Sequence, residues 1–265
     1  MGSGGSGWHG GVVTTRTHSI ARRAGTAVHR TAEERPGSAG EHALQCAYGS
    51  GERADRFYAD QVRDRLLPAM REFVERMEMV VVATADGAGE CDASLRAGPP
   101  GFVRVLDDRT LAYPEYRGNG VHAGLGNITE NPHVGLLMVD FVRDRIGLHV
   151  NGRARIVGDA ELRRAHPGIP VDPARGRRAE RWVVVDVVEA YVHCRKHIPQ
   201  MAVVPERRDW GTDDPARKGG DYFAARGTPA RLPVAAPPRR RFPATTHLGG
   251  GPSRTLRPRA ARARV

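Results

Sequence analysis

The strongest constraint on the fold is a series of short apolar segments between Met79 and His193, joined by tight turns. Residues 79–84 read MVVVAT, which is typical of a buried strand, and Gly98-Pro99-Pro100-Gly101 and Asp107-Asp108 are turn signals between later segments. Strands are predicted at 79–84, 91–95, 102–106, 110–113, 134–141, 146–157 and 182–193. A doubly wound α/β sheet would need helices of about ten or more residues between its strands. The pattern instead predicts a mainly β protein with short helices, built as a closed or nearly closed antiparallel barrel.

Two segments have the period of amphipathic helices. Between residues 54 and 77, apolar side chains recur every three to five positions, at Phe57, Val62, Leu66, Met70, Phe73 and Met77. Pro68 lies inside this run, and it either kinks the helix or begins a second one. A shorter helix is predicted at residues 121–131, where Pro132 ends it.

The net charge of +11 is concentrated at the two ends of the chain. Residues 226–265 carry +10 and residues 1–37 carry +3, which leaves −2 for residues 38–225. Both ends lack the apolar content that offsets chain entropy. We therefore predict a disordered extension at 1–37, one folded domain at 38–225, and a disordered Arg/Pro-rich tail at 226–265. The nearly neutral centre argues against nucleic-acid binding, because phosphate contacts need a basic surface.

Other compositional features exclude several classes of protein. The three cysteines form no C-x-x-C pair, so neither a disulfide framework nor a zinc site is expected. His193 and His197 could share a metal only on a helix, and their segment is predicted as a strand running into a loop, so no metal site is expected. No apolar run approaches the roughly 20 residues of a membrane span. The Gly/Ser-rich start has no apolar leader region, which favours a cytoplasmic protein.

The segment with chemical content runs from residue 92 to residue 131. A strand carrying Ser94 and Arg96 precedes a hairpin, and the next strand leads into a glycine-rich loop containing Arg117. Glycines at 118 and 120 would let backbone N–H groups approach an anion, and the following helix would add further donors. This pattern is typical of a phosphate site. The alternative is a glycine-rich surface turn with two solvated arginines, and the residues alone leave both open.

A family resemblance is carried by several segments in a fixed order. They are VVVATAD (80–86), DASLRAGPPGFV (92–103), DDRTLAYPEYRGNG (107–120), GNITENPHVGLLMVDF (126–141) and LHVNGRARIV (148–157), with a weaker continuation in EAYVHCRKHIP (189–199). In order and spacing they resemble the pyridoxamine 5'-phosphate oxidase-like, FMN-binding split β-barrel family. That resemblance implies a homodimer with two FMN sites at the subunit interface.

The resemblance also implies roles for particular residues. Ser94 and Arg96 would contact the flavin or its phosphate. Tyr113 and Pro114 would lie against the ring edge. The phosphoribityl chain would be held by Arg117, Asn119 and Gly120. Lys196 would be a cation near the phosphate, in the same chain or from the partner.

The chain departs from true pyridoxamine phosphate oxidases at two places. Neither the Arg-x-x-x-x-Lys strand nor the Ser-Arg-Lys loop of those enzymes is present, so no vitamin substrate is predicted. The leading hypothesis is an FMN-dependent oxidoreductase of unknown substrate, reduced by a nicotinamide cofactor or another small electron donor. A deazaflavin-dependent reductase and a non-catalytic flavin- or haem-binding module remain alternatives. His149 is expected to be a structural residue, and Asp140 is expected in a solvated hairpin tip.

Overall fold

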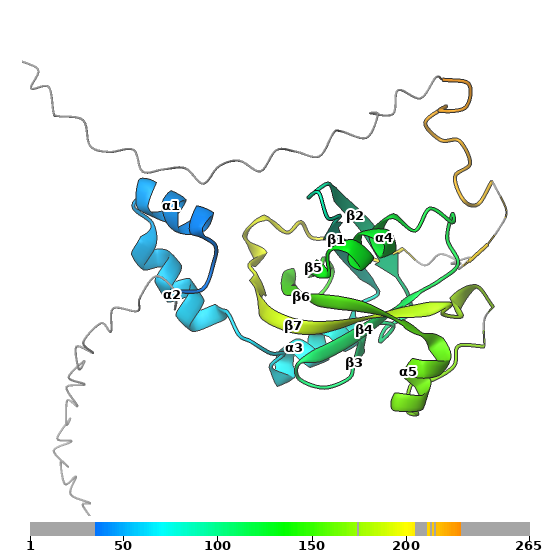
Figure 1. Cartoon of the computed structure of the whole chain (residues 1–265), viewed down its shortest axis with the longest axis horizontal. Helices are drawn as coiled ribbons and strands as arrows, with labels where there is room; N and C mark the ends of the chain where they lie inside the picture. Colours follow the sequence, from blue (N-terminus) through cyan, green and yellow to red (C-terminus); the bar gives the residue numbers. More distant parts are fainter. Residues whose placement is uncertain (1–34, 174, 205–210, 213, 215, 229–265) are drawn as a thin grey trace, which may run out of the picture. The chain divides into compact units, whose positions relative to one another are not determined.

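The computed structural model describes residues 35–173, 175–204, 211, 212, 214 and 216–228 (Figure 1). Apart from residues 35–37 and 226–228, the predicted extension and the predicted tail lie outside these residues. The chain divides into two compact units after Tyr58, and each unit is considered by itself.

The first unit contains a helix that the sequence pattern did not predict. Helix α1 (Ala39–Ala47) begins after Ser38, whose hydroxyl accepts a hydrogen bond from the backbone N–H of Glu41. Helix α2 (Gly51–Gln61) follows, and the Tyr58 hydroxyl donates to the Glu41 carboxylate at 2.8 Å. Buried apolar side chains are lacking in both helices, which explains why no apolar period revealed α1.

The second unit is a seven-stranded antiparallel sheet with the strand order β2-β1-β5-β6-β7-β4-β3 (Figure 1). The strands are β1 (Met79–Ala85), β2 (Cys91–Ala97), β3 (Arg104–Val105), β4 (Thr110–Glu115), β5 (His133–Asp140), β6 (Ile146–Gly158) and β7 (Arg181–His193). Each overlaps a predicted strand, so the mainly β prediction is confirmed. The β3 segment is shorter than predicted, because only two of its residues pair with β4.

Side chains alternate between the core and the outer surface of the sheet. In β1, Val80 and Val82 are buried while Met79 and Val81 are exposed, as a period of two requires. The inner face packs against helix α3 (Pro68–Arg76) and helix α4 (Ala123–Glu130). Pro68 stands in the first turn of α3, so of its two predicted roles it begins a second helix.

Helix α5 (Asp159–Ala165), which the sequence pattern did not predict, lies beside a second, smaller core. This core is centred on Trp182, whose indole N–H donates to Asp159 at 2.9 Å. None of the helices in the described part of the chain combines the length and apolar character that a membrane crossing needs.

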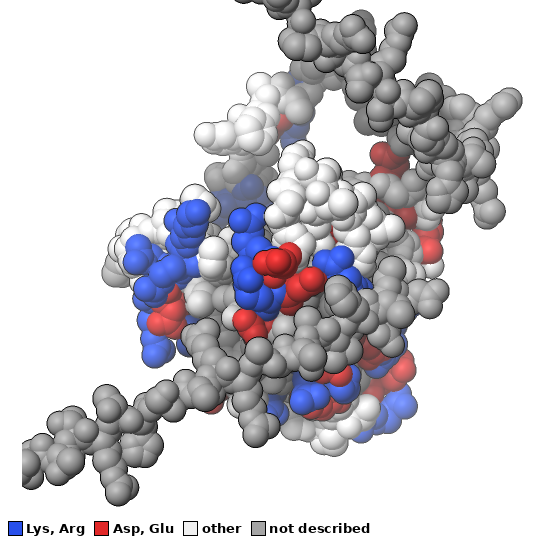
Figure 2. Space-filling model, turned by 90° about the vertical axis from the view of Figure 1, so that its left-hand side faces the viewer, with Lys and Arg blue, Asp and Glu red and all other residues white. Residues whose placement is uncertain are grey.

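Charged side chains of both signs lie on the face of the molecule shown in Figure 2, where several basic and acidic groups are next to one another. Several form exposed ion pairs, such as Arg155 with Asp186 at 2.7 Å. This mixture is consistent with the near-neutral charge of residues 38–225.

Asp140, at the end of β5, is buried rather than solvated, so the expectation of a solvated hairpin tip is wrong for this residue. Its side chain is 8% exposed and accepts hydrogen bonds from the backbone N–H groups of Val142, Arg143 and Asp144. Burial by itself raises the pKa of Asp140, but the N–H groups of Arg143, Val142 and Asp144, together with the charge of Arg76, outweigh it and hold the pKa below its ordinary value. The carboxylate therefore organises the turn between β5 and β6.

Replacing Asp140 by alanine is expected to lower the free energy of unfolding by about 1–3 kcal/mol at neutral pH, because three N–H donors lose a charged acceptor. Because the folded-state pKa is depressed, this stabilisation is fully present above the unfolded pKa of about 3.9 and is lost as pH falls through the folded value. The difference between variant and wild type should therefore shrink as the pH falls below about 4. Urea unfolding at several pH values measures it. Asp186→Ala, at an exposed ion pair, is the control and should show a small difference; a pH-independent penalty for Asp140→Ala would contradict this account.

Candidate functional site

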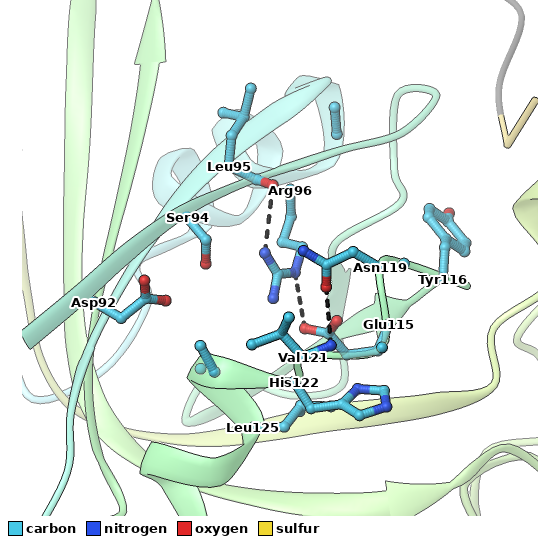
Figure 3. A pocket seen from close by; sticks show the side chains of 15 residues that line it. Asp92, Ser94, Leu95, Arg96, Glu115, Tyr116, Asn119, Val121, His122 and Leu125 are labelled. Carbon is cyan, nitrogen blue, oxygen red and sulfur yellow. Dashed lines mark hydrogen bonds and ion pairs between the residues drawn. The ribbon is translucent and has the colours of Figure 1, made fainter. Parts of the chain in front are cut away.

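A pocket of about 460 Å³ opens where β2, the loop after β4 and the start of α4 meet (Figure 3). It is lined by residues 92, 94–97, 115, 116 and 118–125. Segments far apart in the sequence thus converge at one place, and the volume lies in the range of roughly 300–1,000 Å³ that is usual for small-molecule sites.

An ion pair between Arg96 and Glu115 crosses one side of the pocket. The Nε of Arg96 donates to Glu115 Oε1 at 2.8 Å, and the Glu115 side chain is 12% exposed. Arg96 is on β2 and Glu115 is on β4, which lie near opposite ends of the strand order, so the pair joins two distant parts of the curved sheet. Arg96 Nη1 is directed at the Leu95 carbonyl, and Nη2 has no partner among the described residues.

Ser94 has an unmet hydrogen-bonding group in the same pocket. It precedes Arg96 by two positions on β2, so both side chains lie on the same face of the strand. The Ser94 hydroxyl oxygen is buried and has no hydrogen-bond partner within the described structure. Buried hydroxyls are usually paired, so this one has capacity for a ligand.

The first turn of α4 lies directly against the polar face of β1 and β2. A Cβ atom on Gly124 would be 3.7 Å from Asp92 Oδ2, 3.7 Å from Thr84 Oγ1 and 3.9 Å from Ser94 Oγ. The small residue allows this approach. Asn127, one turn later, donates to Thr84 at 3.0 Å and fixes the helix on the sheet.

The loop before α4 leaves the start of that helix without a side-chain cap. His122 occupies the N-cap position in the left-handed conformation (φ 56°), and no side chain accepts from the first N–H groups of the helix. Gly120 has φ +83°, which favours glycine, and the Asn119 side chain accepts from the N–H of Val121 at 3.0 Å. The free N–H groups of an uncapped helix start are suited to an anion or a polar ligand rim.

The structure brings four of the eight predicted site residues to this pocket: Ser94, Arg96, Asn119 and Gly120. Tyr113 and Pro114 do not line it. Tyr113 is 1% exposed within the main core, and burial raises its pKa. Pro114 is also buried, where β4 pairs with β7. Because β4 is covered on both faces, these two side chains are outside the pocket wall, and their contact with a ring edge stays a prediction.

The remaining two predicted residues lie outside the pocket lining. Arg117 is in the adjoining loop, and its side chain is not part of the pocket wall. Lys196 is exposed in a 3-10 turn, Arg195–His197, which follows β7.

Sequence reasoning missed several lining residues, notably Asp92, Glu115 and Tyr116. Asp92 carried a usable signal, since it alternates with Ser94 and Arg96 on one strand. At the rim, burial and the nearby charge of Asp172 raise the pKa of Tyr116, so its hydroxyl stays protonated at neutral pH. The charged groups of the wall are Asp92, Glu115 and Arg96, so the pocket has no excess of positive charge.

Comparison with known proteins identifies the domain. The sequence profile of the family described as pyridoxamine 5'-phosphate oxidase matches residues 66–194. This range includes all seven strands of the sheet and no part of the first unit. No curated protein sequence matches the chain.

Several solved structures have similar segments at low identity. A putative pyridoxamine 5'-phosphate oxidase from Lactobacillus delbrueckii is 20% identical, with 49% of this chain and 95% of that one covered and a TM-score of 0.36. HupZ from Group A Streptococcus is 22% identical, with 46% and 88% covered and a TM-score of 0.32. A pyridoxamine 5'-phosphate oxidase-related, FMN binding protein from Nostoc punctiforme is 14% identical, with 46% and 77% covered and a TM-score of 0.32.

The profile match spans the antiparallel sheet, α3 and α4, and it includes the strands and the loop that form the pocket. The domain at residues 66–194 therefore belongs to the pyridoxamine 5'-phosphate oxidase family and has its split β-barrel fold.

Proposed function

We propose that this protein is a homodimeric FMN-binding oxidoreductase of the pyridoxamine 5'-phosphate oxidase family, and that FMN binds in the pocket between β2, the loop after β4 and α4. The observation that carries the proposal is the meeting of three unmet donors in one cavity. They are Nη2 of Arg96, the buried hydroxyl of Ser94 and the uncapped N–H groups of α4.

The residues present fit a flavin nucleotide. FMN has a polar ring rim that accepts and donates hydrogen bonds, a polyhydroxyl chain and a phosphate. Ser94 and Arg96 would bond the ring rim or the phosphate, and Asn119 and Gly120 would contact the phosphoribityl chain. When bound, FMN would supply hydride transfer at its isoalloxazine ring, while the protein supplies position and electrostatics.

The charge of the pocket wall bears on the orientation of the ligand. Glu115 already neutralises much of the charge of Arg96, and Asp92 adds a second carboxylate. A phosphate dianion is repelled by these carboxylates. We therefore place the ring rim near Arg96 and Ser94, and the phosphate toward the loop that contains Arg117 and Gly120.

The outer surface of the sheet supports the homodimer. Met79, Val81 and Leu95 are exposed on neighbouring strands β1 and β2, and Leu95 is 58% exposed. Contiguous apolar side chains on a sheet face are typical of an interface between subunits. A second copy would cover them, and Lys196 of one subunit would then be a candidate cation for the site of the other. Light scattering coupled to size-exclusion chromatography is expected to give the mass of two chains.

The experiment that tests the function is identification of the cofactor in the purified full chain. An FMN protein is yellow, releases FMN on denaturation and is bleached by NADH, NADPH or another reductant without oxygen, then regains its colour in air. Selective uptake of a deazaflavin would support the deazaflavin alternative. A haem spectrum, or bound flavin that no donor reduces, would support a non-catalytic module. No uptake of FMN at saturating concentration would refute the proposal.

Gly120 provides a second test, through the conformation of the loop. Replacing Gly120 by alanine is expected to weaken FMN binding roughly five- to thirty-fold, because a side chain at φ +83° costs about 1–2 kcal/mol. Gly118 is the matched control, since a Cβ there meets no atom within 4 Å and its φ is not in the left-handed range. Fluorescence titration with FMN measures both; equal affinities of Gly120→Ala and Gly118→Ala would contradict a role for this loop conformation.

A further inference from the structure

His149 and His193 lie side by side on the face of the sheet opposite the main core. His149 is on β6 between the buried residues Leu148 and Val150, and His193 ends β7. The distance between Nε2 of His149 and Nδ1 of His193 is 3.0 Å. The sequence spacing suggested only a comparison of His193 with His197, so the fold has paired His193 with a histidine 44 residues away.

A glycine in the opposite strand makes room for this pair. Gly147 is the register partner of His193, and a Cβ at Gly147 would lie 2.9 Å from the His193 Cβ and 2.9 Å from the Met138 carbonyl oxygen. A larger residue would therefore displace His193. Because Gly147 has no side chain, the His193 imidazole has room to approach His149 on β6.

The ring of His149 also has an aromatic neighbour. Tyr191 is its register partner and stacks on it, with ring centroids 4.7 Å apart and planes at 14°. Burial and the charge of His193 lower the pKa of His149, so the imidazole is neutral at physiological pH. A neutral imidazole is the form that binds metal ions.

We propose that His149 and His193 form a two-imidazole site for a divalent transition-metal ion, of the Ni²⁺ or Cu²⁺ class. With metal–nitrogen bonds of about 2.0–2.1 Å, two nitrogens 3.0 Å apart subtend roughly 95° at the metal. That angle suits the adjacent positions of a tetragonal or octahedral ion, which Ni²⁺ and Cu²⁺ prefer. A tetrahedral Zn²⁺ site would need the nitrogens a few tenths of an ångström farther apart.

Binding requires a small rotation of both rings and breaks the present hydrogen bond. The ring that donates in it changes to the tautomer protonated at its other nitrogen, so that both facing nitrogens have free lone pairs. No third His, Cys, Asp or Glu side chain is grouped with the pair in the described part of the chain, so water or a small ligand fills the other positions. The site is therefore an open one. It is also distinct from the proposed flavin pocket, whose wall includes neither histidine.

Calorimetric titration of the full chain with Ni²⁺ tests this proposal. His149→Gln and His193→Gln are each expected to weaken the tightest site at least ten-fold, and the double variant to lose it. His133→Gln is the matched control, because His133 is an exposed histidine on β5 that bonds Asn131 and Arg153 instead. The circular-dichroism spectrum and melting temperature of each variant confirm that it is folded.

The chain has 11 histidines, so the stoichiometry matters as well as the affinity. The expected result is one fewer bound Ni²⁺ in the double variant than in the wild type. In addition, the ring resonances of His149 and His193, assigned from the two single variants, should broaden first when paramagnetic Ni²⁺ is added below one equivalent. If the double variant binds Ni²⁺ with the affinity and stoichiometry of the wild type, the metal binds elsewhere on the chain and the proposal is overturned.

Discussion

Replacing Gly152 by alanine is expected to lower the free energy of unfolding by about 3 kcal/mol, the upper end of the usual cost of overpacking. A Cβ at this position would lie 2.4 Å from the Asp186 carbonyl oxygen and 2.7 Å from a methyl carbon of Val185. The first neighbour is backbone and cannot rotate away. Because β6 and β7 form the longest paired segment of the sheet, displacing one from the other loosens the centre of the fold.

The local geometry explains the close approach. The register between β6 and β7 shifts at Gly152: Asn151 pairs with Glu189, but Gly152 pairs with Val187, which leaves Val188 as the extra residue of a bulge. Glycine is often found where a bulge brings two backbones together.

Urea unfolding of Gly152→Ala and the wild type measures the difference. Gly168→Ala is the matched control, because a Cβ at Gly168 meets no atom within 4 Å and its φ is not in the left-handed range. The control should remain within about 0.5 kcal/mol of the wild type. Equal stability of the two variants would show that the strands can separate at the bulge without cost.

Replacing Arg96 by alanine is expected to weaken FMN binding by about 1.5–3 kcal/mol, or roughly ten- to 150-fold, the usual effect of losing a charged hydrogen bond. Arg96 is the basic residue of the pocket wall, and its Nη2 has no partner among the described residues. Arg155→Ala removes an equally large cation from an exposed ion pair away from the pocket, and it should leave the affinity unchanged.

Arg96→Ala is also expected to lower the stability of the fold, and this effect must be separated from the loss of FMN affinity. Without Arg96, the Glu115 carboxylate is left largely buried and unpaired, which destabilises the fold itself. In the double variant Arg96→Ala/Glu115→Gln, the unpaired charge is gone, so stability should recover while FMN affinity stays low. If the affinity recovers together with stability, Arg96 acts by holding β2 to β4, and it does not contact the ligand.

Much of the fold could be predicted because it depends on local patterns. Alternating burial along β1 and the turn signals between the strands are visible in the sequence, and Pro68 marks the start of α3. Helix α5 has seven residues and one buried side chain, Leu162, so it carries no apolar period to detect.

The pocket was less predictable because it depends on how the sheet curves. Ser94 and Arg96 share a strand, and Gly120 shares a loop with Asn119, so each pair is visible locally. The Arg96–Glu115 ion pair cannot be recognised from the local sequence, because it joins strands near opposite ends of the sheet order.

The burial of Tyr113 was also not visible in the sequence. The family resemblance implies a contact of this residue with the ring edge, whereas the pairing of β4 with β7 and the core beneath it bury its side chain. His149 and His193 are likewise brought together only by the register of β6 against β7.

The most direct test of FMN binding in this pocket is a crystal structure of the full chain with FMN bound. Flavin density is expected in the pocket between β2 and α4, with ligand atoms within hydrogen-bond distance of Arg96 Nη2 and Ser94 Oγ. FMN bound on another surface, with the Ser94 hydroxyl still unpaired, would contradict it.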